Sequence, residues 1–191
     1  MSGARIATIG HSTRPPSEVL DMLQAAGVGH LVDVRAFPRS RTNPGFNIDT
    51  FPALLAERQI GYRHDPALGG RRSRQGQVDE EVNALWRERS FHNFADYAMG
   101  PEFADALARV IAEATDRRVA LMCSEAVWWR CHRRIITDHL LLGGHPVEHL
   151  MAPGRTERAK PTPGAERLPD GTIVYAPTQP SLPLAPPPPS R

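Results

Sequence analysis

The sequence predicts an α/β fold: a single domain with a small, mostly parallel sheet flanked by helices, and a disordered proline-rich C-terminal tail. The first observation is a strand, helix and strand pattern in residues 5–35, an order over roughly 30 residues that is typical of parallel strands. The second is another strand and helix pattern in residues 118–150. The third is size, because 191 residues, 40% of them hydrophobic, suit one soluble domain with a core.

The first unit begins with a short apolar run, residues 5–9, which predicts a buried strand ending in the polar turn His11-Ser12-Thr13. Pro15-Pro16 then begins a helix, because proline suits the first helical turn. Residues 30–35 predict a second strand, which ends in charged residues. Crossovers of this kind are almost always right-handed.

The middle of the chain alternates loops and short elements. Residues 36–51 are rich in prolines and arginines and predict a long loop, and loops of that length are more often functional than not. A glycine turn at residues 68–72 leads into a basic, flexible segment that reaches residue 77. The patterns also predict a short helix in residues 51–59 and a third strand in residues 60–64. Two or three further helices are predicted in residues 79–86, 91–99 and 101–115.

Both cysteines lie in the last unit. Its pattern predicts a strand at residues 119–122, a loop to residue 129, a helix from about residue 130 to residue 142 and a short strand at residues 147–150. Two cysteines eight positions apart do not make a secreted disulfide scaffold.

The chain changes character at Pro153. Eleven of its 19 prolines lie from there onward; they favour polyproline II and leave too little apolar surface to order the segment. We therefore divide the chain into an α/β domain, residues 1–152, and a tail, residues 153–191, in which only Val174 and Tyr175 are expected to make a strand-like contact. The sequence shows no signal peptide and no apolar run that spans a bilayer, so a cytoplasmic protein without membrane contact is expected.

The net charge of +2 is too small to indicate nucleic-acid binding by itself. Lys160 is the only lysine, so the positive charge is carried by arginine, which forks onto carboxylate or phosphate groups. A GC-rich genome explains the arginine bias equally well.

Reactive or charged residues follow several of the predicted strands. If these strands are parallel, their carboxyl ends share one edge of the sheet, and ligands bind outside that edge. The residues in question are His11, Ser12, Thr13, Asp33, Arg35, His64, Cys123, Ser124 and Glu125. The sequence therefore predicts a site at this edge.

Cys123 is the candidate nucleophile, because loop N–H groups and the nearby helix N-terminus favour a thiolate there. An inert buried cysteine is the alternative. Glu125 is expected to orient a group, act as a base or cap the helix, and His132 and Arg133 can face back toward the strand ends. Cys131 is expected to pack in the core, or to resolve an oxidised Cys123.

No metal and no cofactor are predicted. The spacing Cys-x7-Cys-His matches none of the usual zinc patterns, although Cys123, Cys131, His132 and His11 are soft ligands. The loop after Cys123 also lacks the glycines of a phosphate cradle.

Several blocks of residues 5–150 together resemble the DUF488 family. They are Thr8-Ile9-Gly10-His11-Ser12, Leu31-Val32-Asp33-Val34-Arg35, Pro38, Ser40, Arg41, Tyr62, Leu68-Gly69-Gly70-Arg71, Cys123-x-Glu125 and Cys131-His132-Arg133. The resemblance implies an α/β domain and a set of site positions, but no reaction. A weaker likeness to rhodanese-type domains rests on Asp33-Val34-Arg35, on Cys123 and on Gly144-His145-Pro146-Val147.

The first functional hypothesis is a thiol-dependent enzyme for an anionic, phosphate-containing or nucleotide-like substrate. Cys123 would attack, helped by His11, Glu125 or His132. The alternative is a nucleotide or nucleic-acid binding module without covalent chemistry, and a third is an interaction domain whose tail recruits a partner. The expected substrate-binding residues are Ser12, Thr13, Asp33, Arg35, Ser40, Arg41, Tyr62, Gly69, Gly70, Arg71 and Arg133. The alternative uses Tyr62, Trp128 and Trp129 as stacking surfaces, and a buried anchor for the loop is the other role expected for the two tryptophans. The sequence does not indicate an oligomeric state.

Overall fold

The computed structural model describes residues 5–177 and contains one six-stranded sheet in the order β3-β2-β4-β1-β5-β6. Five neighbouring strands are parallel, and β6 runs antiparallel to β5 at one edge. The predicted α/β class with a mostly parallel sheet is therefore confirmed. The strands are β1 (Ile6–Gly10), β2 (Val28–Asp33), β3 (Gly61–His64), β4 (Arg118–Cys123), β5 (Val147–Ala152) and β6 (Arg155–Arg158).

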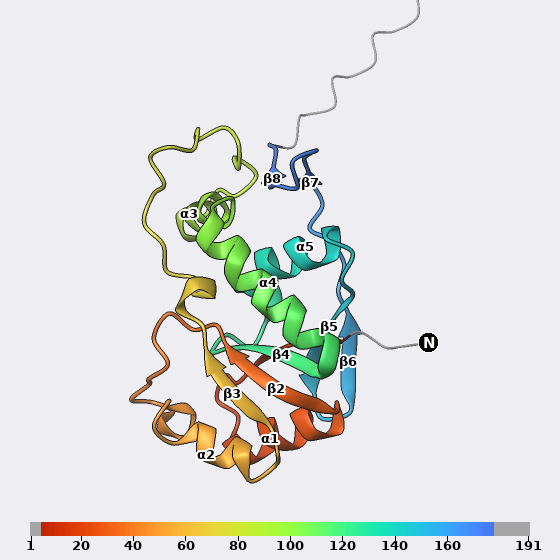
Figure 1. Ribbon diagram of the computed structural model, residues 1–191. Coiled ribbons are helices and arrows are strands. Elements are labelled where there is room, and N and C mark those ends of the chain that lie inside the picture. Colours follow the sequence, from red (N-terminus) through yellow and green to blue (C-terminus); the bar gives the residue numbers. More distant parts are fainter. Residues whose placement is uncertain (1–4, 178–191) are drawn as a thin grey trace, which may run out of the picture.

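Helices cover both faces of this sheet (Figure 1). On one face lie α1 (Pro16–Ala25) and α2 (Phe51–Ala56), and on the other lie α3 (Arg89–Ala98), α4 (Pro101–Asp116) and α5 (Arg133–Leu142). The central strands β1 and β4 are buried almost throughout, which explains why they read as continuous apolar runs rather than as alternating patterns. Each face thus has its own apolar core.

Two expected helices differ in the structure. Residues 79–86 form turns instead of a helix, because the side chain of Asn83 points inward and donates to Asp96 Oδ1 at 2.8 Å. The helix expected from residue 130 begins at Arg133, after a single 3-10 turn, η3 (Trp128–Arg130). Two further 3-10 turns, η1 (Pro44–Phe46) and η2 (Pro66–Leu68), interrupt the predicted loops.

The structured chain reaches beyond the predicted start of the tail at Pro153. A hairpin of β7 (Ala165–Arg167) and β8 (Ile173–Tyr175) packs beside α3 and α5 (Figure 1). Tyr175 is fully buried; its hydroxyl donates to Asp138 at 3.0 Å, and its backbone N–H donates to Asn83. The expected contact at Val174 and Tyr175 is therefore part of a larger packed segment, while residues 178–191, with the proline run, lie outside the described part.

The parallel register brings the carboxyl ends of β1, β2, β3 and β4 to one edge. Gly10 pairs with Cys123, and Asp33 lies between Met122 and His64. The pairing continues past the strands, since the His11 N–H donates to the Cys123 carbonyl at 3.0 Å. A Cβ at Gly10 would lie 1.9 Å from the Glu125 carbonyl oxygen, so only glycine lets the loop after β4 cross β1. No helix within residues 5–177 is long and apolar enough to cross a membrane.

Candidate functional site

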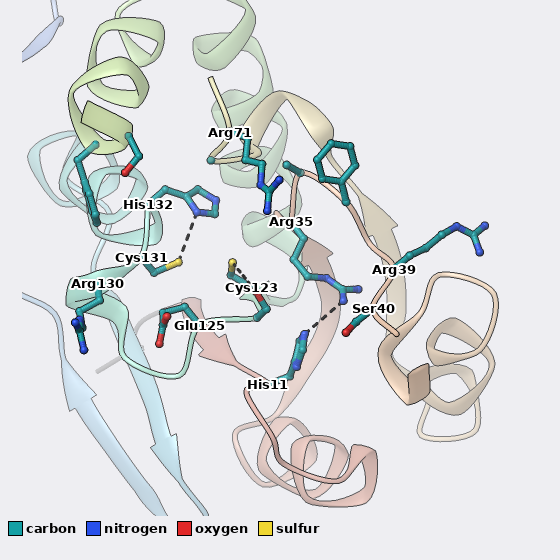
Figure 2. A pocket seen from close by; sticks show the side chains of 16 residues that line it. His11, Arg35, Arg39, Ser40, Arg71, Cys123, Glu125, Arg130, Cys131 and His132 are labelled. Carbon is teal, nitrogen blue, oxygen red and sulfur yellow. Dashed lines mark hydrogen bonds between the residues drawn. The ribbon is translucent and has the colours of Figure 1, made fainter. Parts of the chain in front are cut away.

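A pocket of about 490 Å³ lies at this carboxyl edge. Its walls come from the ends of β1, β2 and β4, from the loops after β2 and η2, and from the turn before α5 (Figure 2). Eight of the predicted site residues line it: His11, Arg35, Ser40, Gly70, Arg71, Cys123, Glu125 and His132. The strand ends therefore do converge, as the parallel order requires.

Seven predicted site residues do not line the pocket: Ser12, Thr13, Asp33, Arg41, Tyr62, Gly69 and Arg133. Thr13 and Arg41 are exposed, whereas Asp33, Gly69 and Arg133 are buried behind the wall. Gly69 makes space instead, because a Cβ there would lie 3.1 Å from Ala36 Cα. Ser124, expected at this edge without a role, also lines the pocket. Seven further lining residues were not expected there: Ala36, Phe37, Arg39, Ser90, Phe91, Arg130 and Cys131.

Arg35 is held by a buried carboxylate. Its Nε lies 2.9 Å from Asp33 Oδ1, and its Nη2 donates to Asp33 Oδ2 at 2.6 Å and to the Phe46 carbonyl at 2.7 Å. Burial disfavours the charged guanidinium, but the Asp33 carboxylate outweighs it and raises the pKa of Arg35. Tyr62 donates its hydroxyl to the same carboxylate at 2.8 Å. Asp33 and Tyr62 thus position Arg35, and neither lines the pocket.

His11 is buried and neutral at pH 7. Its Nδ1 lies 3.0 Å from the Ser12 carbonyl, which assigns the proton to Nδ1 and leaves the Nε2 lone pair toward Arg35 Nη1 at 3.4 Å. Burial, with a further contribution from the Arg35 charge, lowers its pKa to about 4. The ring stacks on Phe46 with centroids 4.2 Å apart. This arrangement gives His11 a role in orienting Arg35, whereas the sequence had suggested an acid or base.

The two thiols meet at the centre of the pocket (Figure 2). Cys123 and Cys131 are 7% and 4% exposed, and their sulfur atoms lie within 4.8 Å of each other and of a His132 ring nitrogen. The His132 Nδ1 is 3.5 Å from Cys131 Sγ. Its Nε2 lies 3.0 Å from the Val34 carbonyl, so Nε2 carries the hydrogen and the Nδ1 lone pair faces the sulfurs.

Gly70 makes room for this histidine. A Cβ at position 70 would lie 2.5 Å from both Cγ and Nδ1 of His132. The ring also meets Phe94 edge to face, with centroids 5.1 Å apart. The ring is therefore fixed from three sides, by glycine, by an aromatic side chain and by the Val34 carbonyl.

The electrostatics distinguish the two cysteines. The neighbouring Cys131 sulfur, within 4.8 Å, raises the pKa of Cys123 to about 12, and burial adds to the effect. Burial would also raise the pKa of Cys131, but the Cys123 thiol and the Arg133 charge lower it to about 6. The two shifts run in opposite directions because the Arg133 guanidinium contacts the Cys131 sulfur, so Cys131 loses its proton more readily than Cys123.

The sequence favoured Cys123 as the thiolate, whereas the contacts of Arg133 favour ionisation of Cys131. Its Nε donates to Cys131 Sγ at 3.3 Å, and its Nη2 donates to the Glu125 carbonyl. The side chain is only 1% exposed, so little water screens its charge. The motif Cys131-His132-Arg133 carried this signal, because it places a base and a cation next to the thiol at the start of α5.

The same three donors are close enough to hold a metal ion. Among residues 5–177, only Cys123, Cys131 and His132 form such a group. Two sulfurs and a nitrogen are donors that zinc accepts, with the pocket leaving room for a further ligand. The metal was argued against from the number of residues that separate the donors in the sequence. The distances between the donor atoms depend instead on the fold, which brings them within 4.8 Å of one another.

Positive charge surrounds the thiols. Four arginines, Arg35, Arg39, Arg71 and Arg130, line the pocket together with a single carboxylate, that of Glu125. Arg39 pairs with Asp49, both exposed. Within residues 5–177, the salt bridges include neither Arg71 nor Arg130. These two exposed guanidinium groups are therefore free to meet an anion.

The tryptophan pair lies outside the pocket lining. Trp128 stacks on His149 with ring centroids 4.3 Å apart, and His149 Nδ1 is 2.7 Å from Thr8 Oγ1. Trp128 therefore anchors the loop after β4 to β1 and β5, one of the two roles expected for it. Trp129 is 45% exposed.

The fold and the pocket together define an open, mostly parallel α/β domain with a dithiol and arginines at the carboxyl edge of its sheet. The chain belongs to the DUF488 family, because the model of the domain of unknown function DUF488 matches residues 15–140. The match runs from α1 into α5 and includes Arg35, Arg71 and both cysteines, while His11 precedes it. No curated protein and no solved structure matches the chain.

Proposed function

We propose that this protein is a thiol-dependent enzyme that binds a small anionic substrate in the pocket and attacks it with the Cys131 thiolate. The observation that carries the proposal is the contact of Cys131 Sγ with Arg133 Nε at 3.3 Å beside His132 Nδ1 at 3.5 Å. A thiolate is the reactive form of cysteine, and a neighbouring cation stabilises it.

The charges around the sulfur support the anionic character of the substrate. Arg71 and Arg130 both line the pocket and lie on opposite sides of the thiol pair (Figure 2). Arg35 adds a third guanidinium, pre-oriented by Asp33. Guanidinium groups bind carboxylate and phosphate oxygens with directed N–H bonds.

Binding of nucleic acid without covalent chemistry has less support. Two of the three stacking surfaces expected for it are engaged inside the protein, Tyr62 with Asp33 and Trp128 with His149. Such a module also has no use for a paired thiol and thiolate beneath its surface.

The test is alkylation with iodoacetamide as a function of pH, on reduced and chelator-treated protein, with peptide mass mapping of the labelled site. We expect Cys131 to be labelled first, with an apparent pKa near 6 rather than the value of about 8.5 of a free cysteine. Cys131→Ser removes the low-pH labelling, whereas Ser90→Ala at the rim keeps it. Labelling of Cys123 alone, with a midpoint at or above about 8.5, would contradict the proposal.

A further inference from the structure

We infer that the pocket catalyses thiol–disulfide exchange on a small disulfide with anionic end groups, in which Cys131 is the attacking sulfur and Cys123 the resolving sulfur. The inference rests on the proposed function, because it needs a reactive Cys131. It adds the bond that is broken, the class of substrate and a role for the second thiol.

The close approach of two thiols is what selects this chemistry. If an acyl group on Cys131 moved to Cys123, the product would be another thioester on the protein, so the second thiol does not complete such a reaction. A disulfide on Cys131 is different, because Cys123 Sγ lies within 4.8 Å of it and can displace the bound group. Intramolecular attack of this kind corresponds to effective concentrations on the order of 10⁵ M or more.

The first step forms a mixed disulfide. The Cys131 thiolate attacks one sulfur of the substrate R–S–S–R, a new bond forms between Cys131 Sγ and that sulfur, and the substrate bond breaks. One thiolate RS⁻ leaves and takes a proton from solvent. Arg133 stabilises the attacking thiolate through its Nε, 3.3 Å away.

The second step releases the other half. The Cys123 proton passes to His132 Nδ1, whose lone pair faces the sulfurs because Nε2–H donates to the Val34 carbonyl at 3.0 Å. Cys123 Sγ then attacks Cys131 Sγ, the Cys131–substrate bond breaks, and His132 returns the proton to the leaving RS⁻. The substrate gains two electrons and becomes two thiols, while the protein dithiol becomes a Cys123–Cys131 disulfide. A small dithiol reductant, such as dithiothreitol, restores the reduced pair.

The unequal thiols fit these two roles. The attacking sulfur needs a cation beside it, and the Arg133 Nε contacts Cys131 Sγ at 3.3 Å. The resolving sulfur needs to reach the mixed disulfide and to have a base nearby, and Cys123 Sγ lies within 4.8 Å of both Cys131 Sγ and a His132 ring nitrogen.

The pocket charge selects among disulfides. Arg71 and Arg130 favour a substrate with carboxylates on either side of the sulfurs, and Glu125 is the only lining carboxylate that opposes it. Glutathione disulfide is an anionic probe with this chemistry. Cystamine, which is cationic, and 2-hydroxyethyl disulfide, which is neutral, carry the same bond with other charges.

The experiment mixes reduced, chelator-treated full-length protein with glutathione disulfide and follows released glutathione together with the intact protein mass. We expect wild type to release two glutathiones per chain and to end as an internal disulfide. Cys123→Ser releases one glutathione and retains the other on residue 131 as a stable adduct. With dithiothreitol present, wild type turns over and Cys123→Ser is slower by at least about 10-fold, a lower bound because dithiothreitol must then resolve the adduct in an intermolecular step.

Charge is tested with the same assay. We expect glutathione disulfide to react faster than 2-hydroxyethyl disulfide, and cystamine to react slowest. Arg71→Gln and Arg130→Gln each reduce the preference for the anion by about 2- to 5-fold, as expected for exposed charges. Arg74→Gln, an exposed arginine outside the pocket lining that pairs with Glu80, is the matched control and leaves the preference unchanged.

The outcomes separate this inference from the proposed function. If Cys131 alkylates at low pH but Cys123→Ser releases both glutathiones as wild type does, Cys123 does not resolve and the inference is overturned while the thiol enzyme stands. An order in which cystamine reacts fastest overturns the substrate class. If Cys131 shows no low-pH reactivity, the proposed function fails and the inference fails with it. Circular dichroism of each variant verifies that it is folded.

Discussion

Replacing Arg133 by methionine tests the electrostatic basis of the site. The Arg133 guanidinium is 3.3 Å from Cys131 Sγ, and Met keeps much of the side-chain volume without the charge. A hydrogen bond to a charged group contributes about 1.5–3 kcal/mol, and one pKa unit corresponds to about 1.36 kcal/mol. We therefore expect Arg133→Met to raise the pKa of Cys131 from about 6 to roughly 7–8.

The assay is the pH dependence of iodoacetamide alkylation at Cys131. At pH 7 the variant should react about 2- to 10-fold more slowly than wild type, because less of the thiol is ionised. Arg134→Met is the matched control: Arg134 donates to Thr162 at 2.8 Å, and its replacement leaves the alkylation midpoint in place. Arg133→Met also loses the hydrogen bond from Arg133 to the Glu125 carbonyl, so its free energy of unfolding should fall by about 1–3 kcal/mol. A folded Arg133→Met protein with an unchanged midpoint would refute the reasoning.

The other predictions concern stability. Asp33→Asn leaves the buried Arg35 charge unpaired and should lower the free energy of unfolding in urea by about 3–5 kcal/mol. The control Asp49→Asn, in the exposed pair with Arg39, should lower it by at most about 1 kcal/mol. Equal losses in the two variants would contradict this prediction. In Gly70→Ala the new methyl group displaces the His132 ring, which should lower the free energy of unfolding by about 1–3 kcal/mol and slow alkylation of Cys131. Alkylation at the wild-type rate would show that the position of the ring does not depend on this glycine. Burial lowers the pKa of His11, His139 and His149 to about 4, so only the unfolded chain gains their protons as the pH falls below about 6.5. Stability should therefore fall between pH 6.5 and 4, and a flat urea midpoint over that range would exclude neutral buried histidines. Removal of residues 154–191 deletes the contacts of Tyr175 and should lower the melting temperature, whereas removal of residues 178–191 deletes none of these contacts; equal melting temperatures would contradict this.

Much of the fold could be predicted because it depends on local patterns. The strands predicted at residues 5–9, 30–35 and 119–122 overlap β1, β2 and β4, because buried parallel strands are apolar on both faces; β2 itself runs from Val28 to Asp33. Helical spacing and the proline near the start of each helix located α1 and α4. The segment after Pro153 was the main difference, because its proline content hid short strands that become buried only against α3 and α5.

The location of the site could also be predicted, because parallel strands end at one edge whatever their order. His11, Arg35 and Cys123 follow three different strands and meet in one pocket. The role of each residue could not be predicted in the same way. Asp33 and Tyr62 looked like binding groups, yet both support Arg35 from behind the pocket.

The sequence by itself determined which segments are strands and helices and which reactive residues stand at strand ends, because hydrophobic period and position along the chain are local properties. Only the tertiary structure decided which thiol ionises more readily. That depends on Arg133 lying 3.3 Å from the Cys131 sulfur, on the Cys123 sulfur lying within 4.8 Å of it, and on burial that keeps water from screening the charge. Ionisation follows distances in space, and Cys123 and Cys131, eight positions apart in the chain, become one coupled pair only when β4 and the start of α5 are packed together.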